Sequence, residues 1–137
     1  MRYRKKLAAL AGMALAGCWL AVNAAPAAAA GPCGRGYEWV DSHRIPDHGP
    51  KTGSIEVYYN PDMERNCAIV QAQASGERQF MSVDIALAGA KKSADADFGM
   101  RKHRAGPVYV SSGGRSCIDL IAIIGPLTRQ VSGEQCH

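Results

Sequence analysis

The first thirty residues constrain this chain most, because they follow the three-part pattern of a secretory signal peptide. A basic start from Arg2 to Lys6 precedes an apolar run from Leu7 to Val22, and a stretch rich in alanine follows. This order is typical of a signal that is removed during export. We expect cleavage after Ala30, with Ala27 and Ala28 as close competitors.

The chain then divides into a signal peptide over residues 1–30 and a single secreted domain over residues 31–137. The domain is predicted to be extracellular and to fold in an oxidising compartment. At 107 residues it is too short for a TIM barrel or for a two-domain dinucleotide-binding enzyme.

Two other interpretations of the N-terminal segment stay open. Leu15-Ala16-Gly17-Cys18 also fits a bacterial lipoprotein signal, in which an acylated Cys18 would become the mature N-terminus. Against it, Trp19 to Val22 extends the apolar run where a polar tether would be expected. The other alternative is a retained membrane anchor, but the apolar run of about sixteen residues is slightly short for a bilayer span. No later segment of the sequence resembles a stop-transfer signal, so we expect no integral membrane segment after cleavage.

Removal of the signal changes the charge of the protein. The whole chain has a formal net charge of +4, from 16 Lys and Arg against 12 Asp and Glu. Four of the basic residues and none of the acidic ones precede residue 31, so the mature domain has a net charge of zero. A neutral domain lacks the electrostatic attraction on which non-specific nucleic-acid binding depends, and we expect no nucleic-acid partner.

The domain keeps four of the five cysteines, which are Cys33, Cys67, Cys117 and Cys136. Four cysteines in a small exported domain indicate two disulfides, for which three connectivities exist. Proximity along the chain favours the pairs Cys33–Cys67 and Cys117–Cys136. A thiolate metal site is disfavoured because the sequence has no Cys-x-x-Cys pair. On the chain-entropy model each disulfide contributes about 3–4 kcal/mol to stability.

Alternating apolar and polar residues, separated by turn residues, predict short strands along the domain and no helix. The expected strands are 37–41, 55–59, 67–73, 81–87, 98–104, 108–110, 117–124 and 127–136, with a break at Pro46 to Pro50. Residues 117–124 are apolar on both faces and predict a central, covered strand, whereas residues 88–97 are small and polar and predict a loop. This pattern predicts an all-β domain, a single antiparallel β-sandwich or small barrel of seven or eight short strands.

Five blocks of the domain carry a family resemblance, and they are Cys33-Gly34-Arg35-Gly36-Tyr37, Val57-Tyr58-Tyr59-Asn60, Asn66-Cys67, Ala105-Gly106-Pro107-Val108-Tyr109-Val110 and Ser116-Cys117-Ile118-Asp119, with Cys136 one residue from the end. Taken in this order, the blocks resemble those of the spore-associated protein A family of small secreted bacterial proteins. The chain departs from the family pattern at Leu120, where the family tends to have an aromatic residue. It departs again at Glu64-Arg65, where the family favours Gly-Lys.

The resemblance implies export, a compact β domain and association with the spore or cell surface. It brings no catalytic residues and no cofactor. We therefore expect a non-enzymatic protein whose partners are spore or cell-wall components.

The weak candidates for a metal site are His43, Asp47 and His48, which lie with Asp41 around the first turn. Imidazole and carboxylate groups are ligands for zinc and other divalent ions. The interval from His43 to His48 crosses Pro46 within a loop, so we expect ordinary surface residues and no metal.

Three further groups of residues are candidates for chemistry or binding. The basic run from Arg101 to Arg104 can engage anionic polymers such as cell-wall phosphates, and we expect it on a solvated strand or edge. Asp119, within an apolar strand, is either a tuned acid or base or an acceptor of backbone or arginine hydrogen bonds. The segment Asp95 to Gly99 begins like a calcium loop but lacks the later ligands.

Two other classes of function compete with surface association. The segment Pro61 to Arg65, with Met63 at its centre and Cys67 nearby, is a candidate for the exposed loop of a secreted protease inhibitor. A small hydrolase that uses Asp119 with a histidine is the other alternative. Ser111-Ser112-Gly113 has no base placed beside it in the sequence, so nucleophilic hydrolysis by serine is unsupported.

Overall fold

The computed structural model describes residues 30–74 and 76–136. The predicted signal peptide, Ala30 apart, and Cys18 lie outside the described residues. Eight strands and no helix form this part of the chain, which confirms the all-β prediction. The strands are β1 (Glu38–Ile45), β2 (Gly53–Asn60), β3 (Arg65–Ala72), β4 (Gln79–Leu87), β5 (Asp95–Arg101), β6 (Arg104–Ser111), β7 (Ile118–Ile124) and β8 (Leu127–Glu134).

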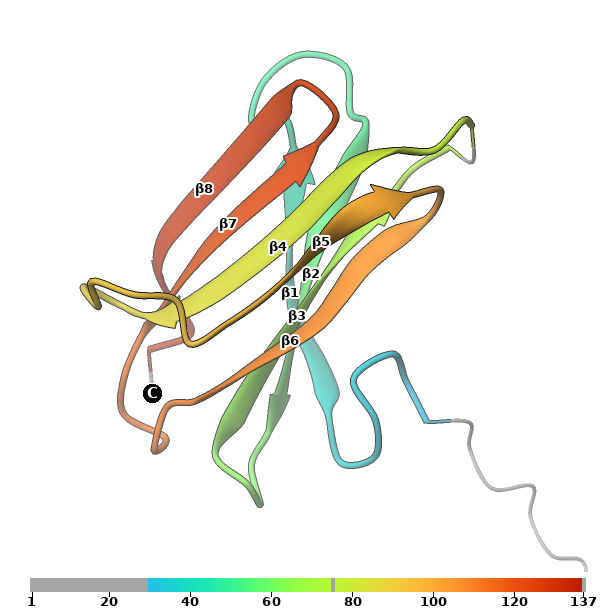
Figure 1. Ribbon diagram of the computed structural model, residues 1–137. Coiled ribbons are helices and arrows are strands. Elements are labelled where there is room, and N and C mark those ends of the chain that lie inside the picture. Colours follow the sequence, from blue (N-terminus) through green and yellow to red (C-terminus); the bar gives the residue numbers. More distant parts are fainter. Residues whose placement is uncertain (1–29, 75, 137) are drawn as a thin grey trace, which may run out of the picture.

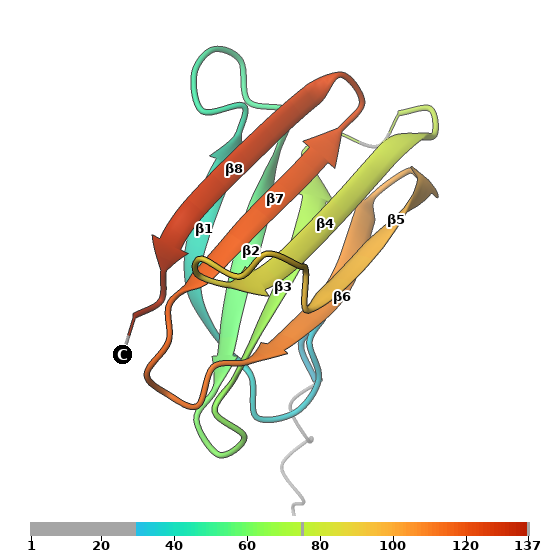
Figure 2. The same cartoon turned by 60° about the vertical axis from the view of Figure 1, so that its left-hand side comes forward.

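The strands form two four-stranded antiparallel sheets that pack face to face (Figures 1 and 2). One sheet has the order β1-β2-β3-β6 and the other the order β5-β4-β7-β8. At one side of the sandwich, β5 and β6 lie next to each other and are joined by a tight turn (Figure 2). At the other side, the edge strands β1 and β8 face each other.

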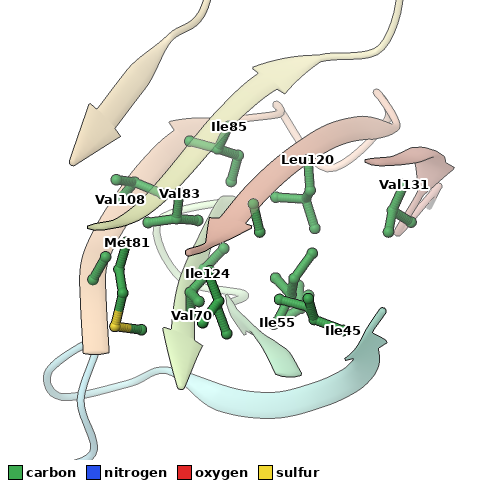
Figure 3. Packing of buried hydrophobic residues seen from close by; sticks show 14 of the residues in the cluster. Ile45, Ile55, Val70, Met81, Val83, Ile85, Val108, Leu120, Ile124 and Val131 are labelled. Atoms are coloured by element: carbon green, nitrogen blue, oxygen red, sulfur yellow. The ribbon is translucent and has the colours of Figure 1, made fainter. Parts of the chain in front are cut away.

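The core lies between the two sheets and follows from the period-two pattern of the strands (Figure 3). In β4, for example, Met81, Val83 and Ile85 point inward and are fully buried, while the residues between them point outward. Ile55 and Val57 of β2 and Leu120 and Ile124 of β7 fill the same interior. Burial of each such side chain stabilises the fold by about 1.5–3 kcal/mol.

Two predictions about single strands are wrong in detail. The predicted loop over residues 88–97 ends earlier, because β5 already begins at Asp95, and the predicted strand over residues 98–104 ends at Arg101. The chain turns at Lys102 and His103, so Arg104 belongs to β6. The second error concerns β7, which is an interior strand of its sheet but is covered on one face alone. Ile121 is exposed on the other face, because no element of the described chain packs over it.

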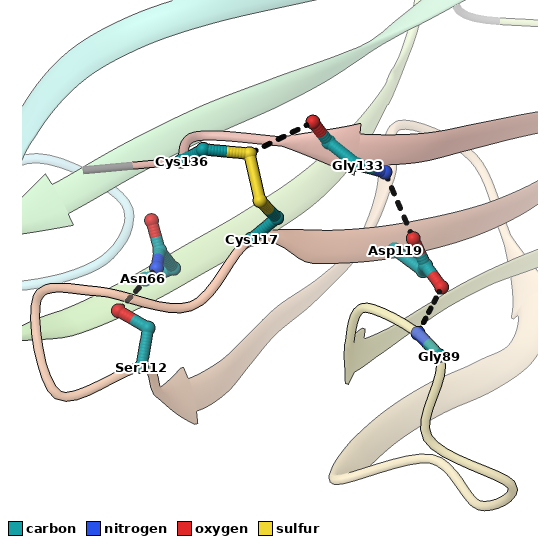
Figure 4. Close-up of a disulfide and its surroundings, with 7 residues drawn as sticks. All are labelled: Asn66, Gly89, Ser112, Cys117, Asp119, Gly133 and Cys136. Carbon is teal, nitrogen blue, oxygen red and sulfur yellow. Dashed lines mark hydrogen bonds between the residues drawn. A yellow bond between two sulfur atoms is a disulfide. The ribbon is translucent and has the colours of Figure 1, made fainter.

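The two disulfides join Cys33 to Cys67 and Cys117 to Cys136, as proximity along the chain predicted. The second one ties the segment after β8 to the start of β7 (Figure 4). Neither disulfide belongs to the main core between the two sheets.

The Cys33–Cys67 disulfide anchors a second, smaller core on the outer face of the β1-β2-β3-β6 sheet. Cys33 and Cys67 are buried there with Ile69, and the tyrosine rings of Tyr37 and Tyr109 pack beside them at a centroid distance of 5.6 Å. The Tyr109 hydroxyl donates a hydrogen bond to the Cys33 carbonyl over 3.0 Å. Burial raises the pKa of Tyr37 above its ordinary value. The segment before β1 therefore covers the part of this face around Cys67 and Ile69.

Candidate functional site

The structure separates the residues that were predicted as weak metal candidates. His43 lies in β1, whereas Asp47 and His48 lie in the loop between β1 and β2. The Asp47 carboxylate is 2.7 Å from the Arg129 guanidinium, and His48 is 95% exposed with its Nε2 atom 3.7 Å from Asp47. These two loop residues therefore do not converge with His43.

His43 instead lies beside Asp41 and Glu134. Its Nε2 atom is 3.6 Å from the Asp41 carboxylate and 4.0 Å from the Glu134 carboxylate. Asp41 and His43 are two positions apart in β1 and therefore point to the same side of the strand, and Glu134 is the last residue of β8. Glu134 was not predicted as part of this cluster, because 91 residues separate it from His43 and only the facing of β1 and β8 brings them together.

Asp119 is half-buried, and its carboxylate accepts backbone hydrogen bonds, which is one of the two roles considered for it. Its Oδ1 atom accepts a hydrogen bond from the Gly133 N–H over 2.9 Å, and its Oδ2 atom accepts one from the Gly89 N–H over 3.1 Å (Figure 4). The carboxylate thus joins β7 to β8 and to the turn after β4. Both oxygen atoms are engaged by the backbone, an arrangement that does not favour acid–base chemistry.

The segment that begins like a calcium loop is the strand β5. The carboxylates of Asp95 and Asp97 accept hydrogen bonds from the backbone N–H groups of Tyr109 and Gly106, over 3.0 and 2.8 Å. The two carboxylates therefore bind the backbone of the edge strand β6 and do not converge on a common point where a calcium ion could bind. Ser112 is likewise structural, because its buried hydroxyl accepts a hydrogen bond from the Asn66 side-chain amide over 3.0 Å (Figure 4).

The outer face of the β5-β4-β7-β8 sheet carries exposed apolar side chains. We call this the apolar face and define it by Phe80 of β4, Phe98 and Met100 of β5, and Ile121 of β7. Phe80 lies directly opposite Met100, and Phe98 lies two pairs further along, opposite Ser82. Phe98 is 67% exposed and Met100 is 55% exposed. The four side chains share one side of the sheet, because Phe80 pairs with Met100, Phe98 pairs with Ser82 and Ile121 pairs with Asp84, all at β4 positions that alternate with the buried Met81, Val83 and Ile85.

A basic pocket adjoins this face at the β5–β6 turn. It is lined by Arg78, Met100, Arg101, Lys102, His103 and Arg104 and has a volume of about 420 Å³. Met100 belongs both to the pocket and to the apolar face, so the two surfaces are continuous. Of these basic side chains, Arg101 alone forms an ion pair with an acidic residue of the described chain, Asp97, at 3.1 Å.

Sequence reasoning identified the basic run but missed the apolar face. The signal was nevertheless present, because Phe98 and Met100 alternate with Asp97 and Gly99 as the side chains of a strand do. The sequence prediction for this segment concerned its basic run, which it placed on a solvated strand or edge, and it assigned no role to Phe98. Only the register of β4 with β5 shows that Phe98 and Met100 lie next to Phe80.

The candidate inhibitor loop is a tight hairpin turn between β2 and β3. Met63 at its tip is 55% exposed, its N–H donates to the Asn60 side chain over 3.1 Å, and the Glu64 carbonyl accepts from the Ser112 N–H over 3.0 Å. A turn held at both ends does not present an extended segment to a protease cleft. The inhibitor hypothesis stays a prediction, which incubation with subtilisin-like and trypsin-like proteases tests.

No family model, no curated protein and no solved structure matches the chain. The similarity to spore-associated protein A therefore stays a prediction that depends on the quoted sequence blocks. No helix within residues 30–74 and 76–136 has the length and apolar character needed to cross a membrane.

Proposed function

We propose that this protein is an exported, non-enzymatic β-domain protein of the spore-associated protein A type. It attaches to the surface of the cell or spore through the apolar face and the basic pocket. The single observation that carries this proposal is the continuity of these two surfaces on a sheet whose outer face has no covering element in the described chain.

The two outer faces of the sandwich differ in a way that supports attachment through one of them. The segment with Cys33 covers the part of the outer face of the β1-β2-β3-β6 sheet around Cys67 and Ile69, whereas no segment of the described chain covers Phe98 and Met100 on the opposite sheet. Contiguous exposed apolar side chains on a soluble domain usually mark a binding surface. Two disulfides are consistent with a protein that works outside the cell.

The charge distribution supports an anionic surface as the partner. The domain is neutral overall, but four of its twelve Lys and Arg side chains line the pocket at the β5–β6 turn, beside the apolar face. Basic groups attract wall phosphates or anionic lipid headgroups at long range, and apolar side chains then add contact energy at short range. Anionic attraction and apolar contact thus act on the same end of the molecule.

A binding assay with isolated spores and cell walls of a filamentous, spore-forming bacterium tests this proposal. Phe98→Ser and Met100→Ser should each weaken the binding of the oxidised protein about tenfold, because each removes a large apolar contact. Met63→Ser is the matched control, because Met63 and Met100 are equally exposed, at 55%, and lie at different ends of the sandwich. Equal binding of all three variants, or a wild-type protein that stays in solution, would refute the proposal.

A further inference from the structure

The cluster of Asp41, His43 and Glu134 differs from an ordinary surface ion pair. The His43 side chain is 12% exposed, and its Nε2 atom is buried without a hydrogen-bond partner in the described chain. His48, by comparison, is almost fully in water. A buried polar atom without a partner costs about 1–3 kcal/mol, so a group that fills the space between this nitrogen and the two carboxylates would be stabilising.

The backbone around the cluster holds the three candidate ligand residues in place. Asp41 and His43 come from one strand at alternating positions, which fixes their separation. Glu134 lies two residues before Cys136, whose disulfide to Cys117 anchors the end of β8. The hydrogen bond from the Gly133 N–H to Asp119 adds a second anchor directly beside Glu134 (Figure 4).

The distances fit a small divalent cation. The candidate ligand atoms of the three residues all lie within 4.8 Å of one another, and the two distances from Nε2 are 3.6 and 4.0 Å. Two ligand atoms on a tetrahedral zinc ion, with bonds of about 2.0–2.1 Å, lie about 3.3 Å apart. The two distances from Nε2 exceed this separation by about 0.3 and 0.7 Å, and the distance between the two carboxylates exceeds it by at most about 1.5 Å, so side-chain rotations of about an ångström would close the site.

We propose that Asp41, His43 and Glu134 form a binding site for a divalent transition-metal cation such as Zn²⁺. One neutral imidazole and two carboxylates supply two negative charges and a nitrogen–oxygen donor set, which suits such an ion better than calcium or copper(I). Water completes the coordination. The ion ties β1 of one sheet to β8 of the other, at the side of the sandwich that has no connecting turn. This site is independent of the proposed attachment surface.

Zinc chloride added to the chelator-treated, oxidised protein tests the site. We expect one zinc ion per chain by calorimetry and by elemental analysis after desalting. We also expect the melting temperature to rise by about 10 °C at a free zinc concentration one hundred times the Kd, since zinc binds the folded chain. A wild-type protein that binds no zinc would overturn the proposal and leave His43 as the partner of two carboxylates alone.

Variants show whether these three residues hold the ion. His43→Gln and Glu134→Gln should each abolish stoichiometric binding, whereas His48→Gln should bind as the wild type does, because His48 lies in the exposed loop. Circular dichroism establishes that each variant is folded, and Asp41→Asn replaces either one that is not. Binding that persists in both His43→Gln and Glu134→Gln, or that is lost in His48→Gln, would place the ion elsewhere and refute the site.

Discussion

The backbone N–H of Gly106 in β6 donates a hydrogen bond to the Asp97 carboxylate of β5 over 2.8 Å, although these strands belong to different sheets. Tyr109 N–H and the Asp95 carboxylate form the same kind of contact over 3.0 Å. The two carboxylates thus bind N–H groups that β6, as an edge strand, would otherwise leave unpaired. Between β5 and β6, side-chain hydrogen bonds therefore join the two sheets in place of backbone-to-backbone hydrogen bonds.

Replacement of Asp97 by alanine should lower the free energy of unfolding by about 1–3 kcal/mol. The reason is that the partly buried Gly106 N–H would lose its acceptor. Urea denaturation measures the effect. Asp62→Ala is the control, because Asp62 is exposed in the turn between β2 and β3 and should change the midpoint little. Equal midpoints for the two variants would show that water replaces the carboxylate without cost.

Replacement of Gly53 by alanine should destabilise the fold by about 1–3 kcal/mol through overpacking. An added Cβ atom would lie 2.4 Å from the Gln71 carbonyl oxygen and 2.4 Å from the Ile124 Cδ1 atom, which belongs to the opposite sheet. Gly31→Ala is the matched control, because a Cβ atom there meets no atom within 4 Å. Thermal unfolding followed by circular dichroism compares the two, and similar melting temperatures would contradict the close approach of the sheets at Gly53.

The sequence was sufficient to predict those features of the fold that are encoded locally. The alternation of Met81, Val83 and Ile85 specifies both the strand and the face that it buries. The two disulfides follow from the export signal and from spacing along the chain, since each joins cysteines that are near in sequence. The boundary between β5 and β6 was predicted wrongly because the charged residues from Arg101 to Arg104 are as typical of an exposed edge strand as of a turn.

The candidate sites were harder to predict, because each depends on pairing between distant segments. His43 and Glu134 meet because β1 and β8 are the facing edge strands, and nothing near either residue in the sequence indicates this. Similarly, Phe98 becomes part of a surface when the register of β5 with β4 places it near Phe80. The local sequence pattern thus predicts which face of a strand a side chain is on, whereas the pairing and packing of the strands determine which residues lie next to it.

Salt should separate the two contributions to surface attachment. Raising sodium chloride from about 0.05 to 0.5 M should weaken binding to cell walls several-fold, because it screens the basic pocket. The double variant Arg78→Ser and Lys102→Ser should lose most of this dependence, and Arg115→Ser, in the loop after β6, should keep it. Phe98→Ser should bind more weakly at every salt concentration. If the double variant keeps the full salt dependence, the basic pocket does not contact the anionic partner.

Glu56 of β2 accepts three side-chain hydrogen bonds on the outer face of its sheet. The donors are the indole of Trp39 at 2.8 Å and the hydroxyls of Ser42 and Ser54 at 2.8 and 2.5 Å. Burial alone would raise the pKa of the Glu56 carboxyl, but these hydrogen bonds and the charge of Lys51 together outweigh it. The pKa of Glu56 is therefore lower than its usual value.

The stability that Glu56 contributes should therefore depend on pH. Because its pKa is lower in the folded than in the unfolded protein, its contribution is complete above about pH 4.3 and is lost as the pH falls through the folded value. Glu56→Gln should lower the free energy of unfolding by about 1 kcal/mol at pH 7, a modest effect because the site is partly solvated. At an acidic pH below the folded value, where the wild-type carboxyl is protonated, the two proteins should differ much less. Urea denaturation at both pH values measures this, with the exposed Glu77→Gln as control. A difference between wild type and Glu56→Gln that stays constant with pH would mean that the charge of Glu56 does not contribute to stability.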